Sequence, residues 1–273
     1  MNIKKISVLI IGTILTITIA LAGCASSTSS TSSGTKADTT TLLGQIKSAG
    51  KIRIGTEGTY SPFTFHDSTG KLTGFDVDIA EAIAKKLGVK TEYVETKWDG
   101  IFAGLDAKRF DIIVNEVGIS TERQAKYDFS DPYILSKPVL LVGKDNTSIT
   151  KFEDLKGKKS AQSLTSNLAK VATSYGATLV QVDGFNQAID LITSKRADAT
   201  VNDSLSFLDL KKQKPDVAIK VAAEGTNPDK NGIMLNKGNK ELLDAINKAL
   251  SDIKADGTYL KISQKWFGAD VSK

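Results

Sequence analysis

The sequence predicts an α/β protein with two similar lobes and a ligand cleft between them. From Lys51 onward, short β-rich runs alternate with helical patterns, as in βαβ units around a parallel sheet. The same alternation starts again after Phe152. Two further β-rich segments, 133–142 and 232–235, lie where the chain would leave the first lobe and return to it. Two such crossings form a hinge, and the cleft beside a hinge is the first place to expect a ligand.

The first lobe is expected to alternate strands and helices. The segment after its first strand, residues 76–87, is the clearest helix, because its apolar residues fall on one face and Gly88 follows as a C-cap. The other expected elements are strands over 51–55, 90–95 and 111–114 and a helix over 98–108.

The second lobe is expected to repeat this order. Its strands are predicted over 158–161, 179–182 and 198–201, and its helices over 166–174, 185–194 and 204–211. Two terminal helices, 240–255 and 257–265, follow the return segment. We therefore expect a discontinuous first lobe, residues 42–137 with 232–273, and a second lobe of residues 138–231.

The N-terminal segment predicts export and lipid attachment. Two lysines precede an apolar stretch, residues 6–22, which has the order of a secretory signal peptide and is shorter than the roughly 20 residues of a transmembrane helix. Leu21-Ala22-Gly23-Cys24 then resembles a bacterial lipobox, in which the cysteine is acylated and becomes the new N-terminus. We expect a signal peptide over 1–23 and a lipid on Cys24. The alternative is an uncleaved membrane anchor.

Residues 24–41 are dominated by Ser, Thr, Gly and Ala without apolar periodicity, so we expect a flexible tether between lipid and globule. Cys24 is the only cysteine, and once it is acylated no thiol remains for disulfides, catalysis or metal binding. The single histidine, His66, is also poor material for zinc. No metal and no cofactor are therefore expected.

Composition and charge argue against a nucleic-acid partner. The chain has 40% hydrophobic and 25% charged residues, which is ordinary for a globular protein, and a net charge of +5. Lys and Arg are interspersed with Asp and Glu along the helical stretches, as on a solvated surface, instead of clustering. The sequence contains no phosphate-binding P-loop and no dinucleotide fingerprint.

Six motifs, in order along nearly the whole mature domain, resemble those of one family. They are residues 55–63, 72–78, 96–100, 115–123, 126–133 and 265–270. By these motifs the chain resembles the bacterial solute-binding proteins for polar amino acids (family 3) of ABC importers, and among them the cystine-binding members. The resemblance implies a two-lobed, type II periplasmic-binding-protein-like fold with two crossover hinge strands. Such a protein closes on its ligand and delivers it to the permease subunits in the membrane.

The resemblance implies that Arg123 grips the α-carboxylate of the ligand. A guanidinium and a carboxylate form two parallel charge-assisted hydrogen bonds. Residues 121–124 also form a possible capping box, which would put Arg123 in the first turn of a helix, where free N–H groups favour an anion. Without the resemblance, a solvent-facing arginine paired with Glu122 would be the simpler explanation. Gly118, which has no side chain, would let its backbone N–H approach the same carboxylate or simply form a turn.

Two motifs of the second lobe are implied to complete the site. Thr165 and Ser166 match hydroxyl residues that contact the carboxylate from the opposite side, and either would also serve as a helix N-cap. Asp203 matches the aspartate that binds the α-ammonium of the ligand, and it follows a predicted strand whose carboxyl end should face the crevice. Its alternative role is the N-cap of the next helix.

First-lobe residues are implied to set the identity of the ligand. Tyr60 and Trp98 match aromatic residues that form walls of the family's binding site. Without the resemblance, each would be expected to cover part of the hydrophobic core. Asn115 belongs to the same motif as Glu116. Glu57 and Glu116 would suit a ligand with a second charged amino-acid end, such as cystine. Cystine-binding relatives tend to have glutamine in place of Glu116, so lysine, arginine or glutamine stays open as the cargo.

We expect a non-catalytic, monomeric protein that binds L-cystine outside the cell membrane, held there by its lipid. The long Ser/Thr tether favours a Gram-positive surface. The main alternative from another class is an enzyme resembling cyclohexadienyl dehydratases on the same scaffold, with Glu57 or Glu116 as general acid. A sensor input domain is a third alternative. No pairing of nucleophile and base is apparent, and His66 is expected at the surface.

Overall fold

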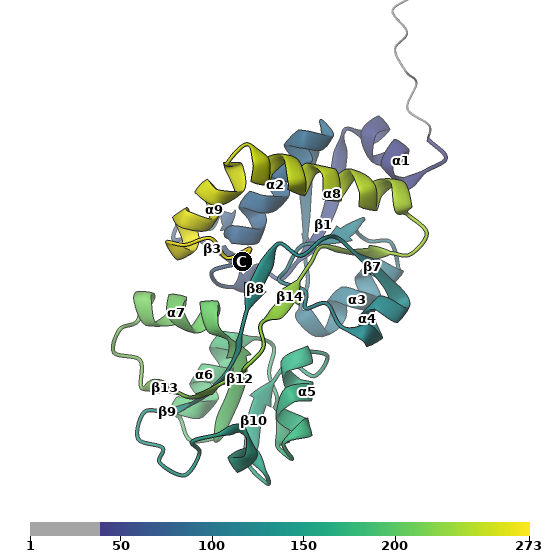
Figure 1. Ribbon diagram of the computed structural model, residues 1–273. Coiled ribbons are helices and arrows are strands. Elements are labelled where there is room, and N and C mark those ends of the chain that lie inside the picture. The colour runs from purple at the N-terminus through teal and green to yellow at the C-terminus, as the bar shows by residue number, and fades with distance from the viewer. Residues whose placement is uncertain (1–38) are drawn as a thin grey trace, which may run out of the picture. The chain divides into compact units, whose positions relative to one another are not determined.

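The structure is a computed structural model that describes residues 39–273. Its two five-stranded sheets, each flanked by helices, form the two lobes (Figure 1). The predicted α/β, two-lobed type II fold is thereby confirmed. The predicted signal peptide, the lipid site at Cys24 and nearly all of the predicted tether lie outside the described residues. Within 39–273, none of the helices combines the length and the apolar character needed to span a bilayer.

The first-lobe sheet has the strand order β5-β1-β6-β15-β7. β1 is parallel to β5 and β6, whereas β15 is antiparallel to β6 and β7. A small three-stranded sheet, β2-β3-β4, lies beside it. The strands are β1 (Lys51–Thr56), β2 (Thr59–Tyr60), β3 (Thr64–His66), β4 (Leu72–Thr73), β5 (Lys90–Glu95), β6 (Ile112–Ile113), β7 (Tyr127–Phe129) and β15 (Met234–Asn236). The helices are α1 (Leu42–Ala49), α2 (Phe75–Leu87), α3 (Trp98–Asp106), α4 (Thr121–Lys126), α8 (Lys240–Ala255) and α9 (Thr258–Phe267).

The second-lobe sheet has the matching order β11-β10-β12-β9-β13. β10 is parallel to β11 and β12, and β9 is antiparallel to β12 and β13. In both sheets the fourth strand, β15 or β9, is the one that the chain enters after a crossing. The strands are β9 (Pro138–Gly143), β10 (Lys159–Gln162), β11 (Thr178–Gln181), β12 (Ala199–Asp203) and β13 (Ile219–Glu224). The helices are η1 (Phe152–Leu155), α5 (Asn167–Ser174), α6 (Phe185–Thr193) and α7 (Ser204–Gln213).

Two short antiparallel strands, β8 (Ile134–Ser136) and β14 (Asp229–Asn231), connect the lobes and run side by side (Figure 1). The β-rich segment predicted over 133–142 contains two strands, β8 and the start of β9. They are separated at Lys137, and β9 begins at Pro138, a proline without an N–H. The predicted return strand, 232–235, is misplaced, because β14 makes the return and β15 belongs to the first-lobe sheet.

Local sequence explains the helix ends. α2 ends at Gly88, which has the left-handed φ of 76° that glycine adopts without cost. α4 is capped by Ser120, whose hydroxyl accepts the Arg123 N–H at 3.2 Å, so the predicted capping box starting at residue 121 is wrong by one position. α1 was not predicted. Its N-cap is Thr41, which places this residue in the folded part and not in the tether.

Each lobe has its own buried apolar core. Phe63, Phe75 and Tyr133 are fully buried in the first, and the Phe75 and Tyr133 rings are stacked with centroids 6.1 Å apart. The second is built around Leu141 and its neighbours on β9 and α6, such as Ile189. β8 and β14 connect these two cores.

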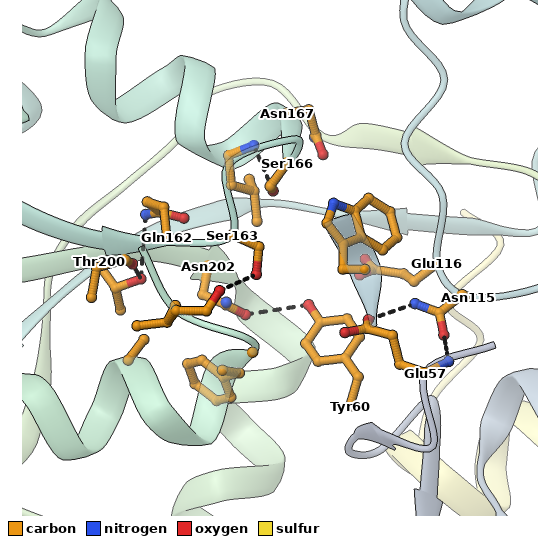
Figure 2. A pocket seen from close by; sticks show the side chains of 17 residues that line it. Glu57, Tyr60, Asn115, Glu116, Gln162, Ser163, Ser166, Asn167, Thr200 and Asn202 are labelled. Atoms are coloured by element: carbon orange, nitrogen blue, oxygen red, sulfur yellow. Dashed lines mark hydrogen bonds between the residues drawn. The ribbon is translucent and has the colours of Figure 1, made fainter. Parts of the chain in front are cut away.

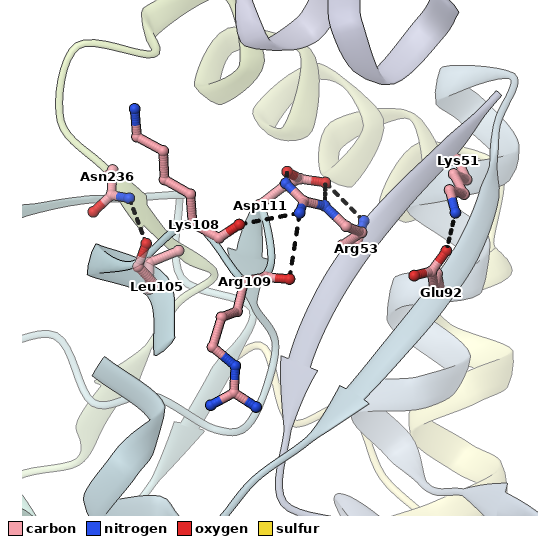
Figure 3. Close-up of polar contacts among 8 residues, drawn as sticks. All are labelled: Lys51, Arg53, Glu92, Leu105, Lys108, Arg109, Asp111 and Asn236. Carbon is pink, nitrogen blue, oxygen red and sulfur yellow. Dashed lines mark hydrogen bonds and ion pairs between the residues drawn. The ribbon is translucent and has the colours of Figure 1, made fainter. Parts of the chain in front are cut away.

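Polar contacts between Arg53 and Asp111, here called the polar clamp, hold β1 to the segment before β6 (Figure 3). Asp111, 6% exposed, accepts the backbone N–H of Arg53 at 2.8 Å and pairs with its guanidinium at 2.6 Å. The same guanidinium donates to the carbonyl of Lys108 at 3.0 Å. These bonds fix the register in which β1 and β6 present their carboxyl ends.

Candidate functional site

A cavity lies where the carboxyl ends of the parallel strands of both lobes face each other. Glu57 follows β1, Asn115 and Glu116 follow β6, and Ser163 follows β10. This is the crevice position expected for ligands in open α/β sheets. Figure 2 shows the lining side chains, which come from both lobes. They are Glu57, Tyr60, Trp98, Asn115, Glu116, Ala161, Gln162, Ser163, Ser166, Asn167, Leu168, Val182, Gly184, Phe185, Ala188, Thr200 and Asn202.

Most of the residues predicted from the sequence come together here, and four do not line the cavity. The lining residues among them are Glu57, Tyr60, Trp98, Asn115, Glu116 and Ser166. The other four lie outside the lining: Arg123 and Thr165 line a separate pocket between Phe102 and Lys170, and Gly118 and Asp203 are absent from both linings. His66 is exposed, its Nδ1–H donates to the Gly58 carbonyl at 3.1 Å, and it lies outside the lining, as the sequence predicts.

Asn115 fixes the position of Glu57. Its carbonyl oxygen accepts the backbone N–H of Glu57 at 2.8 Å and the Thr56 hydroxyl at 3.0 Å, and its amide donates to Glu57 Oε2 at 2.8 Å (Figure 2). Burial raises the pKa of Glu57 to about 7, although the Asn115 hydrogen bond opposes the shift. The first lobe therefore offers a held carboxyl group that titrates near neutral pH.

The backbone of Glu116 has an unusual conformation. Its φ of 49° lies in the left-handed region, which residues other than glycine rarely adopt. The Glu116 N–H donates to Asp76 Oδ2 at 2.6 Å, and the Tyr133 hydroxyl donates to Asp76 Oδ1 at 2.8 Å. Asp76 is 1% exposed, and burial raises its pKa to about 7. A buried network thus holds Glu116 in place.

The Glu116 side chain contacts both crossover strands. Its Oε1 accepts the Ser136 hydroxyl of β8 at 3.3 Å and the Asn231 amide of β14 at 3.1 Å. Asp203, from the second lobe, is a further buried acid, only 4% exposed. Burial, and then the charge of Asp203, raise the pKa of Glu116 well above its usual range. Burial likewise raises the pKa of Asp203.

Two second-lobe residues take the capping roles that the sequence left open. Asp203 is the N-cap of α7 and accepts the Leu205 N–H at 2.8 Å, while remaining 4% exposed. Ser166 caps α5 through the Leu168 N–H at 3.1 Å and also lines the cavity. Capping holds both side chains in one orientation at the crevice.

Arg123 spans the two lobes. Its guanidinium donates to the carbonyl of Gly118 at 2.9 Å and to the carbonyl of Thr165 at 3.1 Å, and it lies 5.4 Å from the centre of the Trp98 ring. Burial lowers its pKa to about 10. A Cβ on Gly118 would approach the Asn167 amide to 3.0 Å, so glycine allows this close approach of the lobes.

Further polar contacts join the lobes, and sequence reasoning missed one partner of the Thr165 and Tyr60 contacts and both partners of the third. Asp99 accepts the backbone N–H and the hydroxyl of Thr165 at 3.0 and 2.9 Å. The Tyr60 hydroxyl donates to Asn202 Oδ1 at 3.3 Å (Figure 2), and Ser61 donates to Asp209 at 2.7 Å. Asp99 lies in the recognised motif 96–100, which was the one available signal.

One buried donor at the cavity has no hydrogen-bond partner. Trp98 is 8% exposed and lines the cavity, and its indole N–H is unpartnered. Burying an N–H group without a partner costs free energy. A hydrogen-bond acceptor on a ligand would therefore be stabilised beside Trp98. Residues 39–273 contain no group of three or more His, Cys, Asp or Glu side chains placed to hold a metal ion.

Known proteins share this architecture. The L-cystine-binding protein TcyA of Bacillus subtilis (strain 168) is 49% identical over 233 residues, which cover 85% of this chain and 87% of the relative. The L-cystine solute receptor of Neisseria gonorrhoeae, solved in the unliganded open conformation, is 47% identical, with a TM-score of 0.58 over 85% of this chain and 99% of the receptor. An ancestral arginine-binding protein bound to arginine is 44% identical, with a TM-score of 0.76 over 80% of this chain and 98% of that protein.

The family assignment rests on a match to a family model. The model of the bacterial extracellular solute-binding proteins, family 3, matches residues 52–269, which include both sheets and the cavity between them. The resemblance predicted from the motifs is thereby confirmed. The chain belongs to the bacterial extracellular solute-binding proteins, family 3.

Proposed function

We propose that this protein captures L-cystine and delivers it to the permease of an amino-acid ABC importer. The observation that carries the cargo assignment is the charge of the cavity. Two carboxyl groups, Glu57 and Glu116, line it, Asp203 lies beside it, and none of the described lining residues is Lys, Arg or His. Buried carboxyl groups without a basic partner favour a ligand with cationic ends. Cystine has two ammonium groups, and the relatives named for L-cystine support the choice.

The carboxylate end of the ligand needs hydrogen-bond donors. Candidates are the unpartnered Trp98 indole N–H and the N-terminus of α5, which line the cavity, and Arg123, whose guanidinium bridges the lobes 5.4 Å from the centre of the Trp98 ring. We propose that on ligand entry the Arg123 guanidinium exchanges the carbonyls of Gly118 and Thr165 for the ligand α-carboxylate. Gly118, Thr165 and Ser166 would contact the same carboxylate, and Asp203 would take the α-ammonium.

We propose that binding closes the lobes, residues 42–137 with 232–273 against 138–231, about β8 and β14. Direct hydrogen bonds across the cavity, such as Tyr60 to Asn202, are the contacts that a closed state requires. The TM-score is higher with the arginine-bound ancestral protein, 0.76, than with the unliganded open receptor, 0.58, and this also supports closure. Lysine, arginine or glutamine in place of cystine would use the same closure.

We also propose that acylated Cys24 holds the protein outside the cell membrane as a monomer, at a Gram-positive surface. Labelling with a fatty-acid analogue should mark the wild-type protein and not Cys24→Ala, which should be released into the medium. Equal labelling of the two proteins would refute the anchor.

The test of the cargo is a thermal-shift screen of the purified protein against the amino acids and cystine. A ligand at about 100 times its Kd stabilises the native state by about 2.7 kcal/mol, which raises Tm by roughly 5–10 °C in a domain of this size. A shift with cystine alone is expected. A shift with lysine or arginine instead would mean that this amino acid, and not cystine, is the cargo. No shift with any amino acid would refute the transport proposal and favour the sensor alternative or the dehydratase alternative, in which Glu57 or Glu116 would be the general acid.

A further inference from the structure

The second-lobe side of the cavity is uncharged. Five of the 17 lining residues come from the first lobe, and they include both lining acids, Glu57 and Glu116. Among the described residues that line the cavity from the second lobe, none is Asp, Glu, Lys, Arg or His. The polar groups there are hydroxyls and amides, and they lie among apolar side chains such as Val182, Phe185 and Ala188. A ligand therefore meets an acidic wall on one side and a neutral wall on the other.

Gln162, at the end of β10, presents a free acceptor on the neutral wall. Its side chain lines the cavity and is 4% exposed. Its Nε2 donates to the Val201 carbonyl at 3.1 Å and to the hydroxyls of Ser160 and Thr200 at 3.2 and 3.3 Å (Figure 2). Because a carbonyl can only accept, the amide nitrogen must face Val201, and this fixes the orientation of the amide. Oε1, on the other side of the amide, accepts no hydrogen bond from the described residues.

Asn202, near the end of β12, presents a free donor on the same wall. Its Oδ1 accepts the backbone N–H of Asp203 at 2.8 Å and the Tyr60 hydroxyl at 3.3 Å (Figure 2). A backbone N–H can only donate, so the amide oxygen must face it, and Nδ2 then has no acceptor among the described residues. β10 and β12 are neighbouring parallel strands, and Gln162 is bonded to the residue before Asn202. The two amides thus stand at one edge of the sheet.

One free acceptor and one free donor on an uncharged wall match the end of an amino acid. An ammonium supplies N–H groups for Gln162 Oε1, and a carboxylate supplies an acceptor for Asn202 Nδ2. The two charges of such an end cancel, so it suits a wall without ionised side chains. A simple cation, as on lysine or arginine, would leave the Asn202 amide N–H groups unpaired and would bring an uncompensated charge to this wall.

Resting on the proposed function and deepening it, we propose that Gln162 and Asn202 form the subsite for the second amino-acid end of L-cystine. The first end is the one assigned to Arg123 and Asp203. The CH2–S–S–CH2 chain joins the two ends, and the Phe185 ring offers the kind of aromatic surface that sulfur contacts favourably. The two amides are specificity-determining residues, because they favour a ligand with two amino-acid ends over one that ends in a simple cation.

Two analogues of cystine test the subsite in the wild-type protein, since each lacks one group of the second end. The mixed disulfide of cysteine with cysteamine lacks the carboxylate, and the mixed disulfide with 3-mercaptopropionate lacks the ammonium. In calorimetric titrations, each should bind at least about tenfold more weakly than L-cystine, because a hydrogen bond to a charged group is lost. If either analogue binds within twofold of cystine, the inference is overturned.

The variant Asn202→Asp tests whether this residue holds the carboxylate. It keeps the shape of the side chain and the acceptor for Tyr60 and the Asp203 N–H, but it replaces the free donor with an anionic oxygen. L-Cystine should bind at least about tenfold more weakly than to the wild type, whereas the cysteamine disulfide should bind as tightly or more tightly. The matched control is Asn167→Asp, which adds a carboxylate to the same lining beside Ser166. It lies at the end that both ligands share, so it should change both affinities by the same factor.

An unchanged preference for cystine in Asn202→Asp, or equal losses for the two ligands, would overturn the inference. The proposed function would still stand, since cystine binds the wild type in both cases. If the wild type binds no amino acid, the proposed function fails and the inference fails with it. If Asn202→Asp does not fold, as judged by circular dichroism, the two analogues still decide the inference on the wild-type protein.

Discussion

Asp99 fastens one lobe to the other without lining the cavity, so its removal tests whether closure contributes to affinity. Asp99 lies in the first turn of α3 and faces the loop before α5. The variant Asp99→Ala removes the acceptor of the Thr165 N–H and hydroxyl, at 3.0 and 2.9 Å, and two longer contacts at 3.4 Å to the Leu164 N–H and the Gln181 amide. The ligand contacts proposed above are untouched, apart from Thr165.

The expected loss follows from the two short bonds. Hydrogen bonds to a charged group contribute about 1.5–3 kcal/mol each when they are buried, but Thr165 is exposed and water can replace part of the interaction. We therefore expect the closed complex to lose about 1–2 kcal/mol, which weakens ligand binding by a factor of about 5–30. The fold of each lobe should be unaffected, because both cores lie elsewhere.

The assay is calorimetric titration of wild type, Asp99→Ala and a control, Lys97→Ala. The control removes an ion pair between the lobes, Lys97 to Asp183 at 2.8 Å, whose side chains are 73% and 61% exposed. Exposed pairs contribute about 0–1 kcal/mol, so Lys97→Ala should weaken binding less than about fivefold. An affinity of Asp99→Ala within twofold of wild type, or an equal loss in Lys97→Ala, would refute the reasoning.

Three further substitutions test the site and the scaffold. Arg123→Ala should abolish calorimetric binding of every α-amino acid while the circular dichroism stays unchanged; an unaltered affinity would rule out the carboxylate role. Asp203→Asn should weaken binding by a factor of about 10–150, since a charged partner of the ammonium is lost; if affinity is retained, that role belongs to Glu57 or Glu116. Asp111→Ala should lower the free energy of unfolding in urea by about 1–3 kcal/mol, because the Arg53 N–H and guanidinium lose their acceptor. A change below about 0.5 kcal/mol would contradict the clamp.

The helices show which parts of the fold can be predicted from local sequence alone. α8 has the predicted bounds, and α2 ends at the predicted Gly88, because amphipathic periodicity and a glycine cap are local signals. α1 was not predicted: it is short and includes Gly44, and it is stabilised by packing against α8 and β1. β14, Asp229–Asn231, has a polar sequence with low strand propensity and forms only because β8 pairs with it.

The site residues also divide into those that the sequence predicts and those that only the structure shows. Motif resemblance led to Glu57, Glu116 and Trp98, which the structure places in the cavity lining. It gave no indication of Asn202 or Gln162, which line the second-lobe side. Nor could it show that Arg123 bridges the lobes in this state, since that depends on how closely the two lobes approach each other.

The sequence by itself determined the α/β alternation, the family, and the acids and aromatics available for a ligand, because these depend on local patterns and on residue types in order. Only the tertiary structure decided which strands cross between the lobes, that Asp99 holds Thr165, and that Glu116 contacts both crossover strands. These features join residues far apart in the chain. Their energies depend on burial and on distances that no local pattern specifies.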